Sequence, residues 1–340
     1  MTRLLICADA GADMGTGHLR RMLTLSAALR GEGASITLQT SPLGAEIART
    51  NREEEFLVVA PCHPQAVGQT LAMTQYDGVI LDNYWWDEAN ETPLRTHVPF
   101  LAVVDDLADR SHDADVLLDQ NAHHDATVYN GLLPDHCRRL VGGKYCLLSA
   151  PFQNERSPAL AKPNAPIFVS LGGGDPHRDL VAVVKTLLAN TARPLTIATG
   201  SHITDAAALR NLAETHSTRL EVIFDSPSVA DQMERSQFAV AAGGTMTWER
   251  ASMGLPSLCL IVADNQIDSA VWLAKRDIHT QFDLRPGWSK HALADAVKSF
   301  AADTKRQHIH HDKSRALVAR DGAVRAAQGL LDSLNKTSLA

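Results

Sequence analysis

The sequence predicts an α/β protein built from two Rossmann-like, doubly wound domains that face each other across a cleft. Two observations support this fold class. Short apolar runs alternate with longer segments of helical periodicity along most of the chain, as expected for parallel sheets covered by helices on both faces. The chain also has 340 residues, which is more than one hydrophobic core usually serves, so two domains are expected.

The alternation is clear in residues 1–150, which we assign to an N-terminal domain. Its apolar runs are short, which is typical of buried strands, and the segments between them have the period of helices. The predicted strands are Leu4–Ala8, Ser35–Gln39, Phe56–Ala60, Gly78–Asp82 and Phe100–Asp105, and the clearest predicted helices are Leu19–Arg30 and Pro64–Thr74.

Residues 151–165 interrupt the pattern and are rich in proline and polar residues, which predicts a linker. The alternation then resumes, and we assign residues 166–340 to a C-terminal Rossmann-like domain that ends in helices. Its predicted strands are Pro166–Leu171, Pro194–Thr199, Leu220–Phe224, Phe238–Ala242 and Ser257–Ile261, and its final helices are Lys290–Ala302 and Ser314–Ser333.

Charge is distributed unevenly along the chain. Residues 1–160 contain 12 basic and 21 acidic side chains, whereas the remaining residues contain 20 and 18. An acidic first half argues against nucleic acid as a partner and against docking on anionic lipid. The nearly neutral second half is the better place for a phosphate-bearing ligand.

We expect a cytoplasmic protein. No apolar run reaches the length of a membrane span, and the first residues lack the basic, apolar and small-residue order of a secretory signal. The five cysteines form no C-x-x-C pair and no even framework, which is typical of reduced thiols in the cytoplasm.

Three glycine-containing loops follow predicted strands and precede predicted helices. Free N–H groups and the helix dipole favour anions at such positions, although tight turns need glycine in any case. None of the loops has the pattern of an ATP phosphate loop or a complete dinucleotide fingerprint. Three loops at strand ends together favour a phosphate-bearing ligand. The loops contain Gly15 and Gly17, then Gly172 and Gly173, and then Gly243, Gly244, Thr245 and Met246.

Glu249 lies one helical turn after the third loop. A phosphate on that loop would leave this carboxylate near the ribose of a nucleotide, and carboxylates accept hydrogen bonds from ribose hydroxyls. The alternative is a glutamate that is favoured in a first helical turn by the helix dipole.

Several motifs together resemble a known family, the UDP-2,4-diacetamido-2,4,6-trideoxy-β-L-altropyranose hydrolases of pseudaminic acid biosynthesis. The resemblance runs from about residue 4 to residue 275. It is carried by Gly15-Thr16-Gly17-His18 with Arg21, Asp82-x-Tyr84, Asp105-Asp106-Leu107-Ala108-Asp109-Arg110, Asp119-Gln120-Asn121, Ser170-Leu171-Gly172-Gly173-x-Asp175, Ala242-Gly243-Gly244 with Trp248-Glu249, and Asn265-Gln266. The sequence departs from the family pattern at Cys7, Gly11 and Ser149, and it has Thr245-Met246 where Ser-Thr is usual.

This resemblance implies a fold similar to that of the GT-B glycosyltransferases, with UDP bound mainly by the second domain and the sugar handled by the first. It also implies attack of water at the anomeric carbon, C–O cleavage with inversion, and release of UDP. The substrate-binding residues that it implies are Gly15, Gly17, Arg21, Asp82, Asp106, Gly172, Gly173, Gly243, Gly244, Thr245, Met246, Glu249, Asn265 and Gln266.

His18 is the predicted general base, because it is the titratable side chain of the first loop best suited to proton transfer near neutral pH. It could instead cap its own helix. Asp13 is a second catalytic candidate, and Asp9 could hold the histidine ring or a sugar hydroxyl. Tyr84 is the third catalytic candidate. Asp82 and Asp106 could also be ordinary strand-end residues.

We predict no cofactor and no metal. The histidines at positions 123–124 and 308–311 have no carboxylate or cysteine partner at a site-like spacing, so solvated surface is expected there. Trp85 and Trp86 could form a stacking platform for a sugar, although one of them is expected in the core.

Three other functions remain compatible with these motifs. A GT-B glycosyltransferase would use the same cleft with a different acceptor. A UDP-sugar epimerase would need additional acid and base groups around the sugar. A nucleotide-sugar binding module without catalysis would have little use for His18 in a polar glycine loop.

Overall fold

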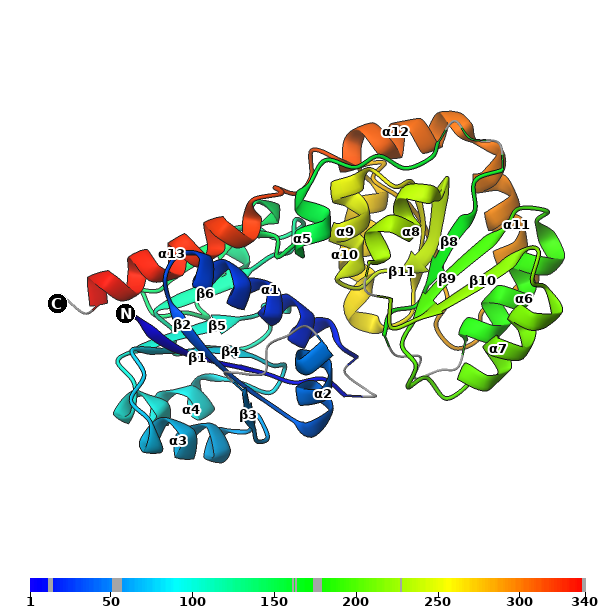
Figure 1. Cartoon of the computed structure of the whole chain (residues 1–340). Helices are drawn as coiled ribbons and strands as arrows, with labels where there is room; N and C mark the ends of the chain where they lie inside the picture. The colour runs from blue at the N-terminus through cyan, green and yellow to red at the C-terminus, as the bar shows by residue number, and fades with distance from the viewer. Residues whose placement is uncertain are drawn as a thin grey trace. The chain divides into compact units, whose positions relative to one another are not determined.

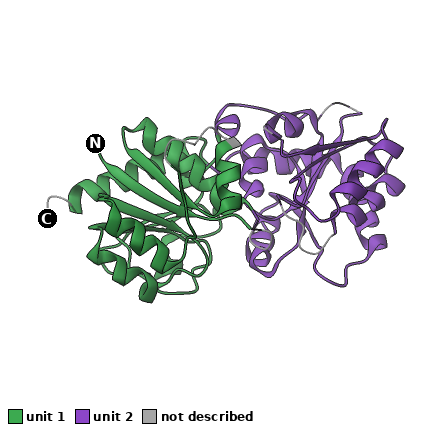
Figure 2. Cartoon of the chain, turned by 60° about the horizontal axis from the view of Figure 1, so that its bottom comes forward, with its two compact units in different colours: residues 1–11, 16–149, 319–340 green, residues 12–15, 150–318 purple. Residues whose placement is uncertain are grey.

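The computed structural model describes residues 1–11, 15–50, 57–160, 162, 164–173, 179–226 and 228–337. The chain divides into two compact units. Unit 1 comprises residues 1–11, 16–149 and 319–340, and unit 2 comprises residues 12–15 and 150–318 (Figure 2). The two units are described separately below.

Unit 1 is built on a seven-stranded sheet whose strand pairs are parallel, in the order β3-β2-β1-β4-β5-β6-β7. The strand order reverses direction between β1 and β4, as in a doubly wound fold. The strands are β1 (Arg3–Ala8), β2 (Ser35–Thr40), β3 (Leu57–Val59), β4 (Gly78–Asp82), β5 (Phe100–Val104), β6 (Val116–Asp119) and β7 (Arg138–Val141).

Both faces of this sheet are buried. Leu4 and Ile6 of β1 point into one hydrophobic cluster, and Leu5 and Cys7 point into the cluster on the opposite face. In Figure 1, α1 and α13 cover one face and α3 and α4 cover the other. The helices are α1 (Gly17–Gly31), α2 (Pro42–Thr50), α3 (Pro64–Met73), α4 (Glu88–Glu91) and α13 (Gly322–Thr337), with short 3-10 helices η2 (Thr92–Thr96), η3 (Ala126–Tyr129) and η4 (Gly143–Tyr145).

The last helix corrects the predicted domain composition, which placed all of residues 166–340 in the second domain. Helix α13 contacts α1 and strands β5, β6 and β7, so it belongs to unit 1 (Figure 1). Its small residues Ala323, Ala326 and Ala327 are buried in the unit 1 core and allow close packing. At the start of the helix, a Cβ on Gly322 would lie 2.4 Å from the Cys146 carbonyl oxygen, so only glycine fits there.

Unit 2 repeats this architecture with six parallel strands in the order β10-β9-β8-β11-β12-β13. The direction of the strand order reverses between β8 and β11. The strands are β8 (Ile167–Ser170), β9 (Leu195–Thr199), β10 (Leu220–Phe224), β11 (Phe238–Ala242), β12 (Ser257–Ile261) and β13 (Thr280–Asp283).

The unit 2 core also alternates along each strand. Leu258 and Leu260 of β12 face the main cluster, whereas Cys259 and Ile261 face a smaller cluster on the other side. Helices α6, α7 and α11 cover the first face, and α9 and α10 lie on the second (Figure 1). The helices are α5 (Ala150–Gln153), α6 (Leu180–Asn190), α7 (Ala206–Thr215), α8 (Val229–Arg235), α9 (Met246–Met253), α10 (Ile267–Ala274), α11 (Lys290–Ala302) and α12 (Thr304–Ser314), with the 3-10 helix η5 (Asp264–Gln266).

The prediction of two doubly wound α/β domains is therefore confirmed. In open parallel sheets, ligands bind beyond the carboxyl ends of the strands at the point where the strand order reverses. These points are the ends of β1 and β4 in unit 1 and the ends of β8 and β11 in unit 2. Most of the predicted site residues follow these four strands.

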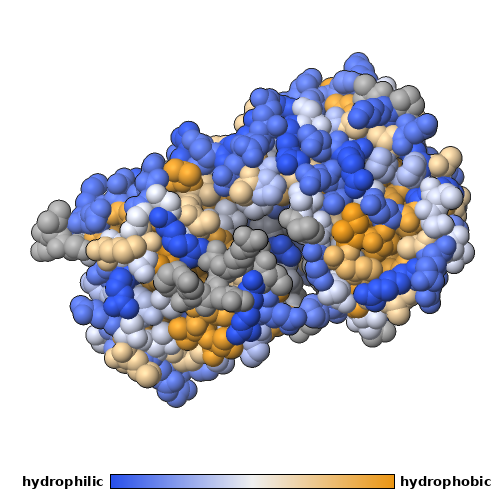
Figure 3. All heavy atoms as spheres, viewed as in Figure 1, coloured by the Kyte–Doolittle hydropathy of each residue, from blue (hydrophilic) through white to orange (hydrophobic). Residues whose placement is uncertain are grey.

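The face seen in Figure 3 is mostly hydrophilic, with apolar residues gathered in a few patches. Trp85 is about half exposed, whereas Trp86 is fully buried in the unit 1 core, so the expectation that one tryptophan lies in the core is confirmed.

Among the helices of the described ranges, none has both the length and the apolar character needed to cross a bilayer.

Candidate functional site

His18 occupies the turn from β1 into α1, where it is the second residue of the helix. Its side chain does not cap α1, because its Nδ1 lies 2.6 Å from Oδ1 of Asp82, the last residue of β4. Strands β1 and β4 are neighbours, with Ala8 in register with Asp82. The sheet therefore places a histidine and a carboxylate in contact where the strand order reverses.

Arg21 completes this contact one helical turn later. Its Nε and Nη2 donate to the two carboxylate oxygens of Asp82 at 2.7 and 2.6 Å, which is a bidentate ion pair. Its Nη1 donates to Oδ2 of Asp106 at 2.6 Å. Arg21 and Asp82 are both buried, so this network fixes α1 against the ends of β4 and β5.

Burial alone would raise the pKa of Asp82, but the charges and hydrogen bonds of Arg21 and His18 lower it to about 2. Asp82 is therefore ionised near neutral pH and accepts hydrogen bonds. His18 Nδ1 carries the proton in this contact, so the 3.1 Å approach of Arg21 Nη2 to Nδ1 is a packing contact and not a hydrogen bond.

The proton on Nδ1 leaves Nε2 of His18 as the basic nitrogen. Nε2 makes no hydrogen bond with the described residues. It is not one of the fully buried polar atoms that lack a hydrogen-bond partner. The small accessible part of the ring therefore includes Nε2. A histidine held at Nδ1 by a carboxylate, with Nε2 accessible, is arranged to accept a proton from a bound water.

The remaining first-domain candidates differ in their placement. Tyr84 packs edge-on against His18, with ring centroids 4.4 Å apart. Asp9 does not orient the histidine, which corrects that expectation, because its carboxylate accepts hydrogen bonds from the backbone N–H groups of Ser41 and Cys62. Asp13 lies outside the described residues.

In unit 2, the loop between β11 and α9 contains Gly243 to Met246. The Gly243 N–H donates to the Leu260 carbonyl at 3.1 Å. Within the described ranges, the N–H groups of Gly244, Thr245 and Met246 have no partner, and Thr245 caps α9 without a side-chain hydrogen bond. Three open donors at a helix N-terminus are suited to an anion such as phosphate.

Gln266 lies against this loop although it is 22 residues further along the chain. Its Oε1 accepts from the Val262 N–H at 3.1 Å and would lie 3.2 Å from a Cβ placed on Gly243. The structure thus brings Gly243, Gly244 and Gln266 together, with Asn265 beside Gln266 in η5 and Glu249 in the first turn of α9.

The second glycine loop of the sequence, which contains Gly172 and Gly173, follows β8, next to β11 in the sheet. Gly172 has a φ of +103°, which favours glycine, and its N–H donates to Ser170 Oγ at 3.2 Å. A Cβ on Gly200, the residue that follows β9, would lie 2.4 Å from the Gly173 carbonyl oxygen, so this position must be glycine.

Sequence reasoning missed further histidine–carboxylate pairs in unit 1, among them the buried His112–Glu91 pair and the His124–Asp119 pair at the end of β6. Nδ1 of His124 lies 2.5 Å from Oδ2 of Asp119, the last residue of β6, and Tyr129 donates to the same oxygen at 3.0 Å. Burial lowers the pKa of His124, but the bond to Asp119 raises it above its ordinary value. The expectation of a solvated His123-His124 segment was therefore wrong. An aspartate ending a strand five residues before a histidine was the available signal.

The late histidines also differ from the expected solvated surface. His308 is exposed, but His310 is buried and stacks on Phe300, with ring centroids 5.5 Å apart. Burial lowers the pKa of His310 to about 4. In the described ranges there is no group of three or more histidine, cysteine, aspartate or glutamate side chains placed to hold a metal ion.

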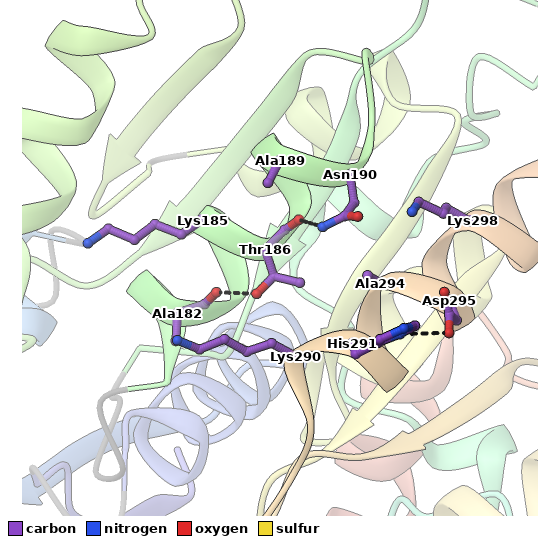
Figure 4. A pocket seen from close by; sticks show the side chains of 10 residues that line it. All are labelled: Ala182, Lys185, Thr186, Ala189, Asn190, Lys290, His291, Ala294, Asp295 and Lys298. Atoms are coloured by element: carbon purple, nitrogen blue, oxygen red, sulfur yellow. Dashed lines mark hydrogen bonds and ion pairs between the residues drawn. The ribbon is translucent and has the colours of Figure 1, made fainter.

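A shallow pocket of about 450 Å³ lies between α6 and α11 of unit 2 (Figure 4). Its charged lining consists of Lys185, Lys290 and Lys298 with the His291–Asp295 pair, whose atoms are 2.9 Å apart. None of the predicted site residues lines it, and its charged side chains are exposed to solvent.

The fold is that of the GT-B proteins. The structure of MurG from Acinetobacter baumannii matches with a TM-score of 0.64 and 12% identity, covering 99% of this chain and 100% of that one. The structure of UGT89C1 from Arabidopsis thaliana complexed with UDP matches with a TM-score of 0.69 and 11% identity, with the same coverage. At these identities the likeness defines the fold alone.

The chain is, more particularly, a distant homologue of the UDP-2,4-diacetamido-2,4,6-trideoxy-β-L-altropyranose hydrolase of Campylobacter jejuni. The two are 23% identical over 285 residues, which cover 82% of this chain and 99% of the hydrolase. An uncharacterised protein of Methanocaldococcus jannaschii is 21% identical over 76% of this chain and 55% of its own length. No protein-family model matches the chain.

Proposed function

We propose that this protein is a UDP-sugar hydrolase of nonulosonic acid biosynthesis. Its substrate would be a UDP-linked diacetamido-trideoxyhexose, and its products UDP and the free sugar with inverted anomeric configuration. The observation that carries the proposal is the His18–Asp82 pair, which lies at the strand reversal of unit 1 with Nε2 of His18 accessible. Homology to the C. jejuni hydrolase over nearly its whole length supports the same activity.

In this proposal His18 Nε2 removes a proton from water as the water oxygen bonds to the anomeric carbon. The bond between that carbon and the β-phosphate oxygen breaks, and its electron pair leaves with UDP. Asp82 stabilises the imidazolium that forms and holds the ring in place. UDP is a good leaving group, so the chain needs to stabilise diphosphate charge more than to donate a proton.

The nucleotide side of the substrate is assigned to unit 2. The open N–H groups of the loop from Gly244 to Met246 suit the diphosphate, and Glu249 suits the ribose hydroxyls. Gln266 and Asn265 complete that side, while Tyr84 and Asp106 belong to the sugar side with His18. We propose no nucleic acid or membrane as a partner.

The reaction assignment is tested by following candidate UDP-sugars by ³¹P and ¹H NMR in H₂¹⁸O. Hydrolysis by C–O cleavage releases UDP without label and places ¹⁸O on the sugar. Label on the β-phosphate would instead mean attack at phosphorus, and a new sugar nucleotide without UDP release would mean epimerisation. Turnover that occurs only with an added sugar or hydroxyl acceptor would identify a glycosyltransferase, the second function that this fold supports.

Glu249→Ala is expected to weaken binding of UDP and of UDP-sugars by a similar factor of about 10–100, because hydrogen bonds to a carboxylate are strong and the ribose is common to both ligands. Calorimetry measures both affinities. The same substitution should have almost no effect on 2′,3′-dideoxy-UDP, which lacks the hydroxyls. Glu214→Ala, at an exposed position of α7, is the matched control. Unchanged UDP affinity in Glu249→Ala would remove Glu249 from the ribose site.

The hydrolysis is expected to proceed without a metal ion, since the open backbone donors of the unit 2 loop can neutralise diphosphate charge. Activity should remain complete after exhaustive treatment with EDTA and should not rise when Mg²⁺ or Mn²⁺ is restored. The assay is UDP release before and after chelation. Loss of activity that either ion restores would require a metal site among the substrate-binding residues.

A further inference from the structure

Arg250 is an arginine of α9 that is almost completely buried, at 2% exposure. Among the residues that the structure describes, its guanidinium donates to two acceptors, and both are neutral. Nη1 donates to the Ala242 carbonyl at 3.1 Å, and Nη2 donates to Thr247 Oγ1 at 3.1 Å. Nε is buried without a partner, and Arg250 forms no ion pair with any carboxylate of the described residues.

The groups packed around this guanidinium do not neutralise it. Burial raises the pKa of the neighbouring Cys259 thiol to about 11, so the sulfur is uncharged. Burial also lowers the pKa of His279 to about 3, so that ring is neutral. Glu249 acts on Arg250 through its charge, yet desolvation outweighs it and the pKa of Arg250 falls. A buried cation without a counter-ion is costly, and proteins usually pair such charges.

The two acceptors of Arg250 define its position. Ala242 is the last residue of β11, and Thr247 is the second residue of α9, so they flank the glycine loop on both sides. The guanidinium therefore lies behind the loop whose N–H groups at Gly244, Thr245 and Met246 are open. A positive charge there adds to the helix dipole at the place where an anion would bind.

We propose that Arg250 is a positioning residue whose buried charge, with its bonds to both ends of the loop, prepares the unit 2 glycine loop for a diphosphate. The missing counter-ion of Arg250 is then the ligand itself, held on the opposite side of the loop backbone. This inference rests on the proposed UDP site. It assigns to that site a further residue, Arg250, which contacts the glycine loop and not the ligand. The guanidinium should matter for the diphosphate and not for the uridine.

The test measures binding of uridine, UDP and inorganic pyrophosphate by calorimetry to the full-length protein and to three variants. Arg250→Met removes the charge and keeps an unbranched side chain, and Arg250→Lys keeps the charge. Arg219→Met is the matched control. Arg219 also donates to main-chain carbonyls, those of Leu188 and Thr191. It lies at the amino end of the edge strand β10, whereas the glycine loop follows the carboxyl end of β11.

Arg250→Met is expected to weaken UDP and pyrophosphate about 10–100-fold and to leave uridine within about twofold, as removal of one charge close to an anion implies. Arg250→Lys should recover much of that loss, and Arg219→Met should bind all three ligands like the parent. Thermal unfolding is measured in parallel. Replacing an unpaired buried charge by an apolar group can leave stability unchanged or raise it, so the two readouts should move independently.

Two results would overturn this inference while leaving the UDP site in place. One is parental UDP affinity in a folded Arg250→Met variant. The other is an equal loss of uridine and UDP binding, which would make Arg250 a structural residue of the whole pocket. If the parent protein bound pyrophosphate but not UDP, the proposed function would fail, and the pyrophosphate data would still decide the role of Arg250.

Discussion

Replacing His18 by Asn is expected to lower the turnover of the UDP-sugar by about 10²–10⁴-fold and to leave UDP affinity nearly unchanged. The rate falls because loss of a general base removes an interaction that is made mainly in the transition state. Affinity is retained because the proposed diphosphate and ribose contacts lie in unit 2, whereas His18 belongs to unit 1. Asn can keep a hydrogen bond to Asp82 in place of Nδ1, so the buried carboxylate retains a partner.

Single-turnover kinetics and calorimetry with UDP separate the two effects. Thermal unfolding of the same variant shows whether lost activity reflects lost folded protein. A folded His18→Asn variant with near-parental turnover would contradict the assignment, and Asp13 or Asp106 would then be the next base to substitute. A fall in UDP affinity equal to the fall in turnover would instead place His18 in ground-state binding.

Asp82→Asn is expected to have the second-largest effect, on stability as well as on rate. The carboxylate is fully buried and pairs with Arg21 and His18, so its removal leaves a buried guanidinium without that partner. Breaking one side of a buried ion pair commonly costs about 3–5 kcal/mol. Asn also cannot fix the proton on Nδ1 of His18, so the folded fraction should turn over slowly. Urea denaturation and turnover per folded molecule measure the two effects.

The pH dependence gives this prediction a second readout. The pKa of Asp82 is lowered from 3.8 to about 2 in the folded protein, so its contribution to stability is complete above about pH 4 and is lost as pH falls through 2. That contribution is worth about 2 kcal/mol. The parent protein should therefore lose more stability between pH 4 and pH 2 than Asp82→Asn does. Equal losses over this range would mean that Asp82 is not held ionised by Arg21.

Asp109→Asn is the matched control for Asp82→Asn. Asp109 also accepts from an arginine, Arg110, at 2.7 Å, but its side chain is 58% exposed. Exposed ion pairs contribute about 0–1 kcal/mol, so this variant should unfold close to the parent and keep its turnover. A large effect at Asp109 would show that loss of any acidic residue, and not the buried pair, causes the change.

The sequence by itself determined the α/β class, five of the seven strands of the first sheet and five of the six strands of the second, missing β6, β7 and β13. Gly78–Asp82, Leu220–Phe224, Phe238–Ala242 and Ser257–Ile261 were predicted with the bounds that β4, β10, β11 and β12 have. For β4, β11 and β12 this succeeds because all of their residues are buried, so these strands are mostly apolar, and that requirement is local. Glycines and acidic residues directly after these apolar runs marked the ends of the strands.

Local patterns did not identify the partners of those strand-end residues. Whether Asp82 was a turn residue or a site residue depended on β4 pairing with β1, which brings it to His18 across 64 positions of sequence. The same holds for Asp119 with His124 and for Arg250 behind the glycine loop, because burial and charge pairing arise only once the sheet is assembled.

The position of the last helix, α13, could not be predicted from the sequence. The sequence predicted a last helix over Ser314–Ser333, whereas α13 spans Gly322–Thr337 and residues 315–321 are not helical. Nothing in the residues of this helix specified which of two similar cores it would cover. Helix α13 packs on unit 1 because its surface fits residues that are distant in sequence. Gly322 packs closely against Cys146, and Gly329 packs closely against Leu140. Sequence periodicity specifies that one face of a helix is buried. Only the packed structure determines which surface that face packs against, because complementary shape is a property of two surfaces together.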